Sequence, residues 1–173
     1  MAHVLVSATR KSAGKTTLPA GIAAALSGRG ATVQAFKKGP DYIDPMWLAA
    51  GTGRPCYNLD YHTMTEDEII GTFAHHGADA DISVIEGNKG LFDGLDLDGA
   101  NSNAALATLL GAPVVLIVDA VGMTRGVAPL ILGYQTFDPE MCLAGVILNR
   151  IGGSRHEAKL KRIIEHYTDV PVI

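Results

Sequence analysis

Residues 4–17 have the sequence VLVSATRKSAGKTT, which is an apolar strand pattern followed by a short loop and the start of a helix. A Gly-Lys-Thr between a strand and a helix is typical of loops that bind the phosphates of a nucleoside triphosphate, because backbone N–H groups of the loop and helix converge there. Lys15 is expected to neutralise β- and γ-phosphate oxygens, and the Thr16 hydroxyl to bind Mg²⁺. The usual pattern has a further glycine at the position of Thr9, so the half that contacts phosphate is retained.

This motif predicts that ATP and Mg²⁺ bind at the loop. The expected contacts come from Arg10, Lys11, Ser12, Ala13, Gly14, Lys15, Thr16 and Thr17. Asn149 and Arg150 end a later strand, where nucleotide-binding proteins with this loop often contact the base through an asparagine side chain. We therefore include both residues in the predicted nucleotide site.

The composition fits one α/β domain over residues 1–173. Hydrophobic residues make up 47%, charged residues 18%, and there are 20 glycines, which suits buried parallel strands joined by glycine-rich loops. A net charge of −4 without a basic stripe argues against nucleic-acid binding. No apolar run approaches the roughly 18–20 residues that cross a membrane. Cys56 and Cys142 form no C-x-x-C pair, which favours a reducing cytoplasm.

Strand and helix patterns alternate along the chain and predict repeated βαβ units around a mainly parallel sheet. The expected strands cover residues 3–8, 32–36, 82–85, 113–118 and 143–148, and another begins at Pro171. The expected helices cover residues 15–27, 46–50, 65–76, 101–110, 127–136 and 154–166. The loops that begin at residues 9, 37, 86, 119 and 149 should converge on one site, because ligands bind at the carboxyl ends of such strands. A chain that ends within a strand is expected to be a piece of a longer protein.

Acidic residues occur in two of these loops. Asp41 and Asp44 follow the second expected strand, and Glu86 ends the third, where an acid can hold Mg²⁺ directly or through water. We predict that Asp41, Asp44, Glu86 and Lys15 are catalytic, and that Thr16, Asp41 and Glu86 bind the metal. Asp41 and Asp44 also flank prolines, so the alternative is that they are turn residues whose side chains cap local backbone.

Four strings resemble those of one enzyme family. They are FKKGPDYIDP (residues 36–45), TGRPCYNLD (52–60), VIEGNKGLFDG (84–94) and GVILNRIGGSRHE (145–157). In order and spacing they are similar to the amino-terminal domain of the cobyrinic acid a,c-diamide synthase family. Members of that family are ATP- and glutamine-dependent amidases of corrin and related tetrapyrrole carboxylates. The resemblance covers essentially the whole chain.

The resemblance implies a three-layer P-loop NTPase fold related to dethiobiotin synthetase, and a role in cobalamin biosynthesis. It implies that Lys15 and Thr16 bind phosphate and Mg²⁺, and that Glu86 belongs to the metal shell. Asp41 and Asp44 would lie near the transferring phosphoryl group and the substrate carboxylate, and Asn149 would face the adenine. The tetrapyrrole substrate would contact Tyr42, Asn88 and Asp93.

Two departures from the family pattern stand out. Ser12 replaces a glycine of the loop, and Arg10 and Lys11 stand where small residues are usual. Arg10 lies five residues before Lys15, where partitioning-type ATPases carry a lysine that reaches a partner subunit's phosphates. Two alternatives for Arg10 stay equally open: its charge helps to bind the triphosphate, or it belongs to a loop that is exposed to solvent. The second departure is the absence of the family's glutaminase domain, which would release ammonia from glutamine.

Three alternatives stay open. The first is a carboxylating ligase like dethiobiotin synthetase, against which the strings PDYIDP and GLFDG weigh. The second is a partitioning or assembly ATPase that forms a homodimer around ATP, supported by Arg10 alone. The third is an amidase of another macrocycle, since the motifs do not separate cobyrinic acid from hydrogenobyrinic acid, sirohydrochlorin or sirohaem.

Overall fold

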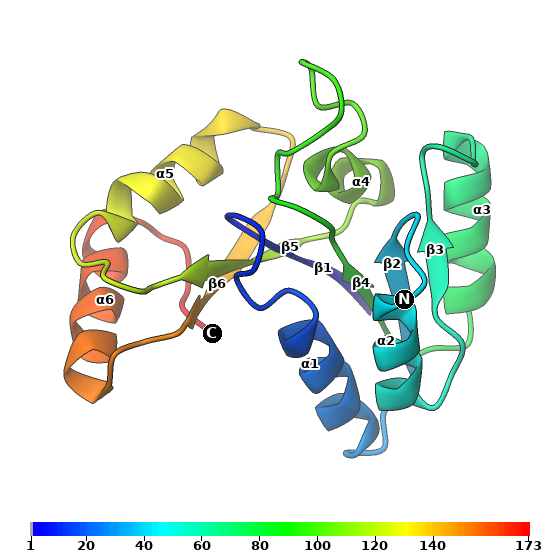
Figure 1. Cartoon of the computed structure of the whole chain (residues 1–173), viewed down its shortest axis with the longest axis horizontal. Coiled ribbons are helices and arrows are strands. Elements are labelled where there is room, and N and C mark those ends of the chain that lie inside the picture. Colours follow the sequence, from blue (N-terminus) through cyan, green and yellow to red (C-terminus); the bar gives the residue numbers. More distant parts are fainter. Residues whose placement is uncertain (1) are drawn as a thin grey trace.

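The computed structural model describes residues 2–173 as a three-layer α/β fold (Figure 1). Six parallel strands form one sheet in the order β3-β2-β4-β1-β5-β6. The strands are β1 (Ala2–Ala8), β2 (Val33–Lys38), β3 (Tyr57–Leu59), β4 (Ile82–Glu86), β5 (Val114–Asp119) and β6 (Leu143–Asn149). The helices are α1 (Thr17–Ser27), α2 (Asp44–Thr52), α3 (Glu66–Gly77), α4 (Asn103–Leu110), α5 (Val127–Phe137) and α6 (Ser154–Tyr167).

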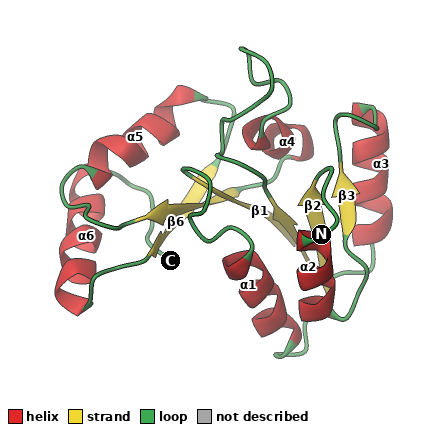
Figure 2. Cartoon of the chain, viewed as in Figure 1, coloured by secondary structure: helices red, strands yellow, loops and turns green. Residues whose placement is uncertain are grey.

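Helices cover both faces of the sheet (Figure 2). The pair α1 and α2 packs on one face, while α3, α4, α5 and α6 contribute to the core on the other. Successive strand residues point to opposite faces, so Leu5 joins the larger apolar cluster and Val6 the smaller one. The apolar strand patterns in the sequence therefore reflect burial on both sides, as parallel sheets require.

The sheet topology explains where the phosphate-binding motif lies. β1 pairs with β4 on one side and with β5 on the other. The chain first builds the sheet toward β2 and β3 and later crosses to β5 and β6, so the strand order reverses beside β1. Such a switch point leaves a crevice at the carboxyl ends of the strands, and residues 9–16 follow β1 directly into it.

The predicted parallel α/β architecture is confirmed, with local corrections. β2 extends to Lys38, so Lys37 and Lys38 are strand residues and not loop residues. The strand Tyr57–Leu59 was not predicted, because its three residues follow a proline and show no clear alternation. The first helix begins at Thr17, two residues later than expected. Beyond Pro171 the chain makes only a single bridge, between Val146 and Val172, where a strand was expected.

Helix α3 begins where its sequence predicts. The Thr65 hydroxyl accepts a hydrogen bond from the Glu68 N–H, and the Glu68 carboxylate accepts from the Thr65 N–H, which is a capping box. Among the described residues, no helix is both long and apolar enough to span a bilayer.

Candidate active site

The loop between β1 and α1 has two residues in the left-handed backbone region, Ser12 (φ 60°) and Gly14 (φ 103°). The Asn149 side chain donates a 2.8 Å hydrogen bond to the Ala13 carbonyl, so the end of β6 fixes the loop. A Cβ on Gly14 would lie 2.5 Å from Asn149 Nδ2, and only glycine fits this close approach. Ser12 stands at a position where glycine would be unstrained, and its left-handed backbone costs about 1–2 kcal/mol.

A cavity of about 520 Å³ opens in front of this loop. It is lined by the loop itself, with Lys15 and Thr16, and by residues at the ends of β2 and β4. Its volume is in the range of small-molecule sites. Among the residues predicted for the site, the cavity brings together Lys11, Ser12, Gly14, Lys15, Thr16, Thr17, Asp41, Asp44, Glu86 and Asn88.

Lys15 turns back over its own loop. Its ammonium donates a 3.0 Å hydrogen bond to the Arg10 carbonyl. Burial and the nearby charge of Lys37 lower the pKa of Lys15 from its usual value, although the surrounding carboxylates oppose that shift. Two ammonium groups facing one cavity repel each other, and an anion between them would relieve that repulsion.

Lys37 lies at the centre of the acidic residues. Its side chain is only 2% exposed. The ammonium contacts Glu86 Oε1 at 3.0 Å, Asp44 Oδ2 at 2.9 Å and the Gly87 carbonyl at 3.2 Å. Burial opposes its charge, but Glu86 and Asp44 outweigh burial and raise the pKa of Lys37 above its usual value. The sequence reasoning missed this residue because it placed Lys37 in a loop.

Glu86 is fully buried at the end of β4. Its Oε1 accepts hydrogen bonds from the Thr16 hydroxyl at 3.1 Å and from Lys37 at 3.0 Å. Its Oε2 is buried with no hydrogen-bond partner. Burial raises the pKa of Glu86 to about 7, although Lys37 opposes the shift. An orphaned carboxylate oxygen beside the Thr16 hydroxyl is a potential ligand position.

Asp41 and Asp44 have different local roles. Asp41 Oδ1 accepts hydrogen bonds from the N–H groups of Ile43 (2.9 Å) and Asp44 (3.1 Å), which is the turn role considered as an alternative. Its Oδ2 lies 3.9 Å from the Lys37 ammonium. Asp44 instead points its carboxylate at Lys37, and although burial alone would raise its pKa, this hydrogen bond holds the pKa of Asp44 below its usual value.

The loop after β4 is fixed by Asn103, which the sequence reasoning also missed. The Asn103 amide donates to the Gly90 carbonyl at 2.8 Å and to the Asn88 carbonyl, and its Oδ1 accepts from the Asn88 N–H. Asp93 accepts a 2.9 Å hydrogen bond from the Gly90 N–H and lines a neighbouring cavity. The predicted substrate residues Asn88 and Asp93 therefore belong to one rigidly bonded loop at the edge of the nucleotide cavity.

Arg10 and Arg150 converge on a carboxylate that was not singled out from the sequence. Both guanidinium groups contact Asp119 Oδ2, and the Asp119 side chain is only 2% exposed. A backbone N–H at Val121 and the two arginines hold the pKa of Asp119 below its usual value. Arg10 is thus bound within its own chain at the end of β5, and its guanidinium does not line the nucleotide cavity.

Tyr42 is 80% exposed and does not line the cavity, unlike its neighbours Asp41 and Asp44. Ile43, Met46 and Trp47 are exposed beside it at the start of α2. This group forms an apolar surface at the rim of the site.

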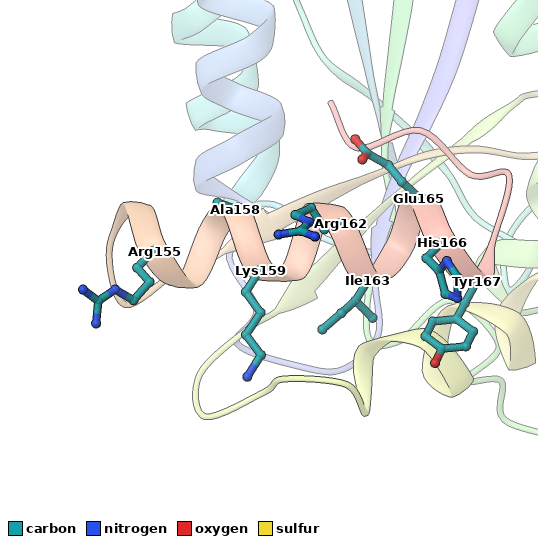
Figure 3. A pocket seen from close by; sticks show the side chains of 8 residues that line it. All are labelled: Arg155, Ala158, Lys159, Arg162, Ile163, Glu165, His166 and Tyr167. Carbon is teal, nitrogen blue, oxygen red and sulfur yellow. The ribbon is translucent and has the colours of Figure 1, made fainter.

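A separate hollow of about 730 Å³ runs along α6 (Figure 3). It is lined by Arg155, Lys159, Arg162, His166 and other residues of that helix. None of the phosphate-loop, β2 or β4 residues borders it, so we assign it no part in the site.

Comparison with known families shows which family the chain belongs to. Residues 4–173 match the model of the CobQ/CobB/MinD/ParA nucleotide binding domain, CbiA. The chain belongs to this family. The family is defined by a nucleotide-binding domain, so the prediction that this chain binds a nucleotide agrees with it.

The resemblance to cobyrinic acid a,c-diamide synthases is also confirmed. The cobyrinate a,c-diamide synthase of Magnetococcus marinus is 48% identical over 171 residues, which are 99% of this CbiA-family chain and 37% of the relative. The enzyme of the same name from Methanosarcina acetivorans is 50% identical over 175 residues, covering 99% of the chain and 35% of the relative. The chain therefore spans about a third of the length of these relatives.

Solved structures support the P-loop fold alone. The hydrogenase maturation factor HypB from Archaeoglobus fulgidus superposes with a TM-score of 0.60 at 16% identity, covering 100% of this chain and 80% of HypB. The signal recognition particle receptor FtsY from Elizabethkingia anophelis, solved with GDP, gives 0.66 at 13% identity, covering 99% and 56%. At such low identity, only the fold is shared.

Proposed function

We propose that this chain is the ATP-using part of an enzyme that amidates carboxylates of a corrin-type tetrapyrrole, with ammonia derived from glutamine by a separate part of the protein. The observation that carries the proposal is the cluster of Lys37, Asp44 and Glu86, with Lys37 and Glu86 buried, in the same cavity as Lys15 and Thr16. The relatives named cobyrinate a,c-diamide synthase supply the substrate class.

The chemistry accounts for the arrangement of charges. A carboxylate is a poor acyl donor, because its leaving group would be oxide. Transfer of the γ-phosphoryl group to a carboxylate oxygen gives an acyl phosphate and ADP. Attack of ammonia on the acyl carbon then forms the amide and breaks the acyl–oxygen bond, and the proton lost by the nitrogen ends on the released phosphate. The protein must bring two anions together, which needs positioning and positive charge.

Two lysines that line the cavity supply that charge. Lys15 is positioned by the phosphate loop, and its ammonium leaves the Arg10 carbonyl when it binds the triphosphate. Lys37 comes from β2, and its ammonium is held by Asp44 and Glu86. We infer that Lys37 faces the incoming carboxylate or the transferring phosphoryl group. Its burial keeps water away and strengthens its electrostatic effect.

The residues present fit a Mg²⁺ ion. Glu86 Oε2 lacks a partner, and the Thr16 hydroxyl lies beside the same carboxylate. The described residues contain no ready-made cluster of three or more His, Cys, Asp or Glu side chains, but Mg²⁺ commonly uses one or two protein ligands plus phosphate oxygens and water. Thr16 and Glu86 would hold the ion, with Asp41 and Asp44 nearby. When bound, Mg²⁺ would neutralise charge on the β- and γ-phosphate oxygens.

The proposal is tested with the purified chain, ATP, Mg²⁺, cobyrinic acid and ammonium chloride. We expect release of ADP that depends on both cobyrinic acid and ammonium, and mass spectrometry should detect the amide. Hydroxylamine in place of ammonium should trap the acyl phosphate as a hydroxamate. An equal rate of ADP release with and without cobyrinic acid would contradict the proposal and favour an ATPase switch.

The variant Asp44→Asn serves as a matched probe. It should retain ATP binding, since the Asp44 carboxylate pairs with the Lys37 ammonium at 2.9 Å and the substitution leaves Lys15 and the backbone of the phosphate loop unchanged, but lose most of the cobyrinate-dependent ADP release. Asp169→Asn is the control, because Asp169 bonds Gln135 far along the chain from the site.

A further inference from the structure

A second cavity of about 410 Å³ adjoins the nucleotide cavity. Its walls are the end of β2, the segment after β3 and the loop after β4. Asn88 and Lys89 line both cavities, so a single ligand could reach from one into the other. The phosphoryl-transfer chemistry described above uses none of the charged groups that are specific to this second cavity.

Lys38 is the most unusual of these groups. It is only 6% exposed, yet no hydrogen bond or ion pair is formed by its ammonium among residues 2–173. Its contact is with the Tyr61 ring, whose centroid lies 5.8 Å from the ammonium. Burial lowers the pKa of Lys38 to about 8, with Asp60 opposing that shift, so the group is still largely charged near neutral pH. A largely buried lysine that lines a cavity, and whose ammonium has no hydrogen-bond acceptor among the described residues, favours an anionic ligand in that cavity.

Lys89 adds a second positive charge to the same cavity. It follows Asn88 in the loop after β4, and its backbone lies in the left-handed region at φ 37°. Lys89 is close enough to Lys38 to disfavour the charge of that residue. The cavity therefore holds two ammonium groups near each other, an arrangement that an anion between them would stabilise.

Among the described residues, no acidic group of the wall forms an ion pair with Lys38 or Lys89, although Asp60 is close enough to favour the charge of Lys38. Asp60 accepts hydrogen bonds from the His62 N–H at 3.0 Å and from the Thr63 hydroxyl at 2.9 Å. Asp93 accepts from the Gly90 N–H at 2.9 Å. Both carboxylates are thus used to shape their own loops. Glu66, at the start of α3, is the remaining acid of the wall.

We propose that this second cavity binds a carboxylate of the acceptor other than the one that reacts, with Lys38 as its main contact and Lys89 as a second. The inference rests on the proposed function, because it takes the acceptor to be a polycarboxylate. Anchoring one carboxylate at Lys38 would fix which other carboxylate reaches Lys37 in the neighbouring cavity. Lys38 would then determine both the preference for polyacids and the position that is amidated.

The test is calorimetric titration of the purified chain with three probes: ATP, cobyrinic acid, and the fully methyl-esterified form of cobyrinic acid, which has no carboxylate charges. The variant Lys38→Met removes the charge and keeps the apolar stem, and Lys38→Arg keeps the charge. Lys159→Met, on the exposed face of α6, is the matched control. Because hydrogen bonds to charged groups are worth more than neutral ones, we expect Lys38→Met to weaken cobyrinic acid binding by about tenfold or more.

The remaining measurements distinguish a loss of cobyrinic acid binding from a loss of folding. ATP affinity should not change in Lys38→Met, Lys38→Arg should bind cobyrinic acid nearly as well as the parent chain, and the ester should bind weakly to all variants alike. Equal cobyrinic acid affinity in Lys38→Met and the parent chain would overturn the inference. Loss of ATP and cobyrinic acid binding together would show a structural role and would also overturn it.

Failure of this inference is distinct from failure of the proposed function. The proposed function is measured by cobyrinate-dependent ADP release, which does not require Lys38 to be the anchor. If the parent chain releases ADP in that assay and Lys38→Met has unchanged affinity and an unchanged amidation pattern, only the inference fails. If the parent chain does not bind cobyrinic acid at all, the inference fails whatever the ADP assay shows.

Discussion

Lys37 and Glu86 are neighbours across the β2–β4 pairing, and their side chains form a buried ion pair with a 3.0 Å separation between Nζ and Oε1. The exposed fractions of the two side chains are 2% and 0%. Desolvation of two such charges is costly, and the pair is stable only because Asp44, Thr16 and the Gly87 carbonyl provide further hydrogen bonds. Burial of charged groups at the carboxyl ends of the strands, despite its cost in desolvation free energy, is typical of a functional site.

Removing one member of this pair should be destabilising. Lys37→Met leaves the Glu86 carboxylate buried without its cation, so we expect the free energy of unfolding to fall by about 3–5 kcal/mol. The double variant Lys37→Met/Glu86→Gln should lose less than the sum of the two single variants. Urea denaturation of the four proteins measures this coupling, and additive effects would show that the ion pair has no energetic role.

The pKa of Glu86 predicts a specific pH dependence of stability. Burial raises the folded-state pKa to about 7 from the usual 4.5, so the folded protein holds more protons than the unfolded chain between these values. Stability from this residue is therefore present at low pH and lost as the pH rises from about 4.5 to 7, by roughly 3 kcal/mol in total. Glu86→Gln should remove that decline.

Denaturation curves at pH 5 and pH 7 test this dependence. The unfolding free energy of the parent chain relative to Glu86→Gln should be lower at pH 7 than at pH 5. Glu165→Gln, an exposed acid on α6, is the control and should show no such difference. A parent chain that gains stability relative to Glu86→Gln between these two pH values would show that Glu86 is ionised throughout.

The fold could be predicted from the sequence because the local patterns of strands and helices agree with the spacing that the whole fold requires. Apolar strand patterns, helix caps and a glycine-containing loop alternate with the spacing that βαβ units require, and the Thr65–Glu68 cap is an example. The strand β3 could not be predicted from the sequence, because three residues after a proline are too few to show a strand periodicity. Its place at the sheet edge is set by pairing with β2 and not by its own sequence.

Part of the candidate site could also be predicted from the sequence, because some of its residues belong to recognisable motifs. Lys15, Thr16 and Glu86 belong to motifs whose spacing fixes their position relative to the strands. Lys37, Asn103 and Asp119 act through contacts with residues far away in sequence, for instance the bond from Asn103 to Ser7. Such partners are decided by sheet register and loop packing. For Lys37 a signal existed, since extending the expected strand 32–36 by one residue would have placed it beside Glu86.

Lys15 should be essential for nucleotide binding. Lys15→Ala removes the loop's ammonium from the cavity, so we expect ATP binding with Mg²⁺ to become undetectable by calorimetry. Lys159→Ala is the surface control and should bind ATP as the parent chain does. Unchanged ATP affinity in Lys15→Ala would refute the assignment of this loop as the phosphate site.

Ser12 offers a test of strain in the phosphate loop. Its φ of 60° is a conformation in which glycine loses nothing and other residues pay about 1–2 kcal/mol. Glycine also has more freedom in the unfolded chain, which offsets part of the gain. We therefore expect Ser12→Gly to stabilise the folded protein by about 0.5–1 kcal/mol. Ser27→Gly, in the last turn of α1, should destabilise it by a similar amount.

Urea denaturation of the two serine variants measures the change in the free energy of unfolding. Titration with ATP shows whether the strained backbone at Ser12 contributes to ATP affinity. If Ser12→Gly is more stable and binds ATP equally well, the strain at Ser12 is only tolerated. If it is more stable but binds ATP more weakly, the serine holds the loop in the conformation that meets the phosphates, because a glycine there would have to be ordered on binding. A less stable Ser12→Gly would contradict the strain itself, and would mean that the serine side chain contributes more than its backbone conformation costs.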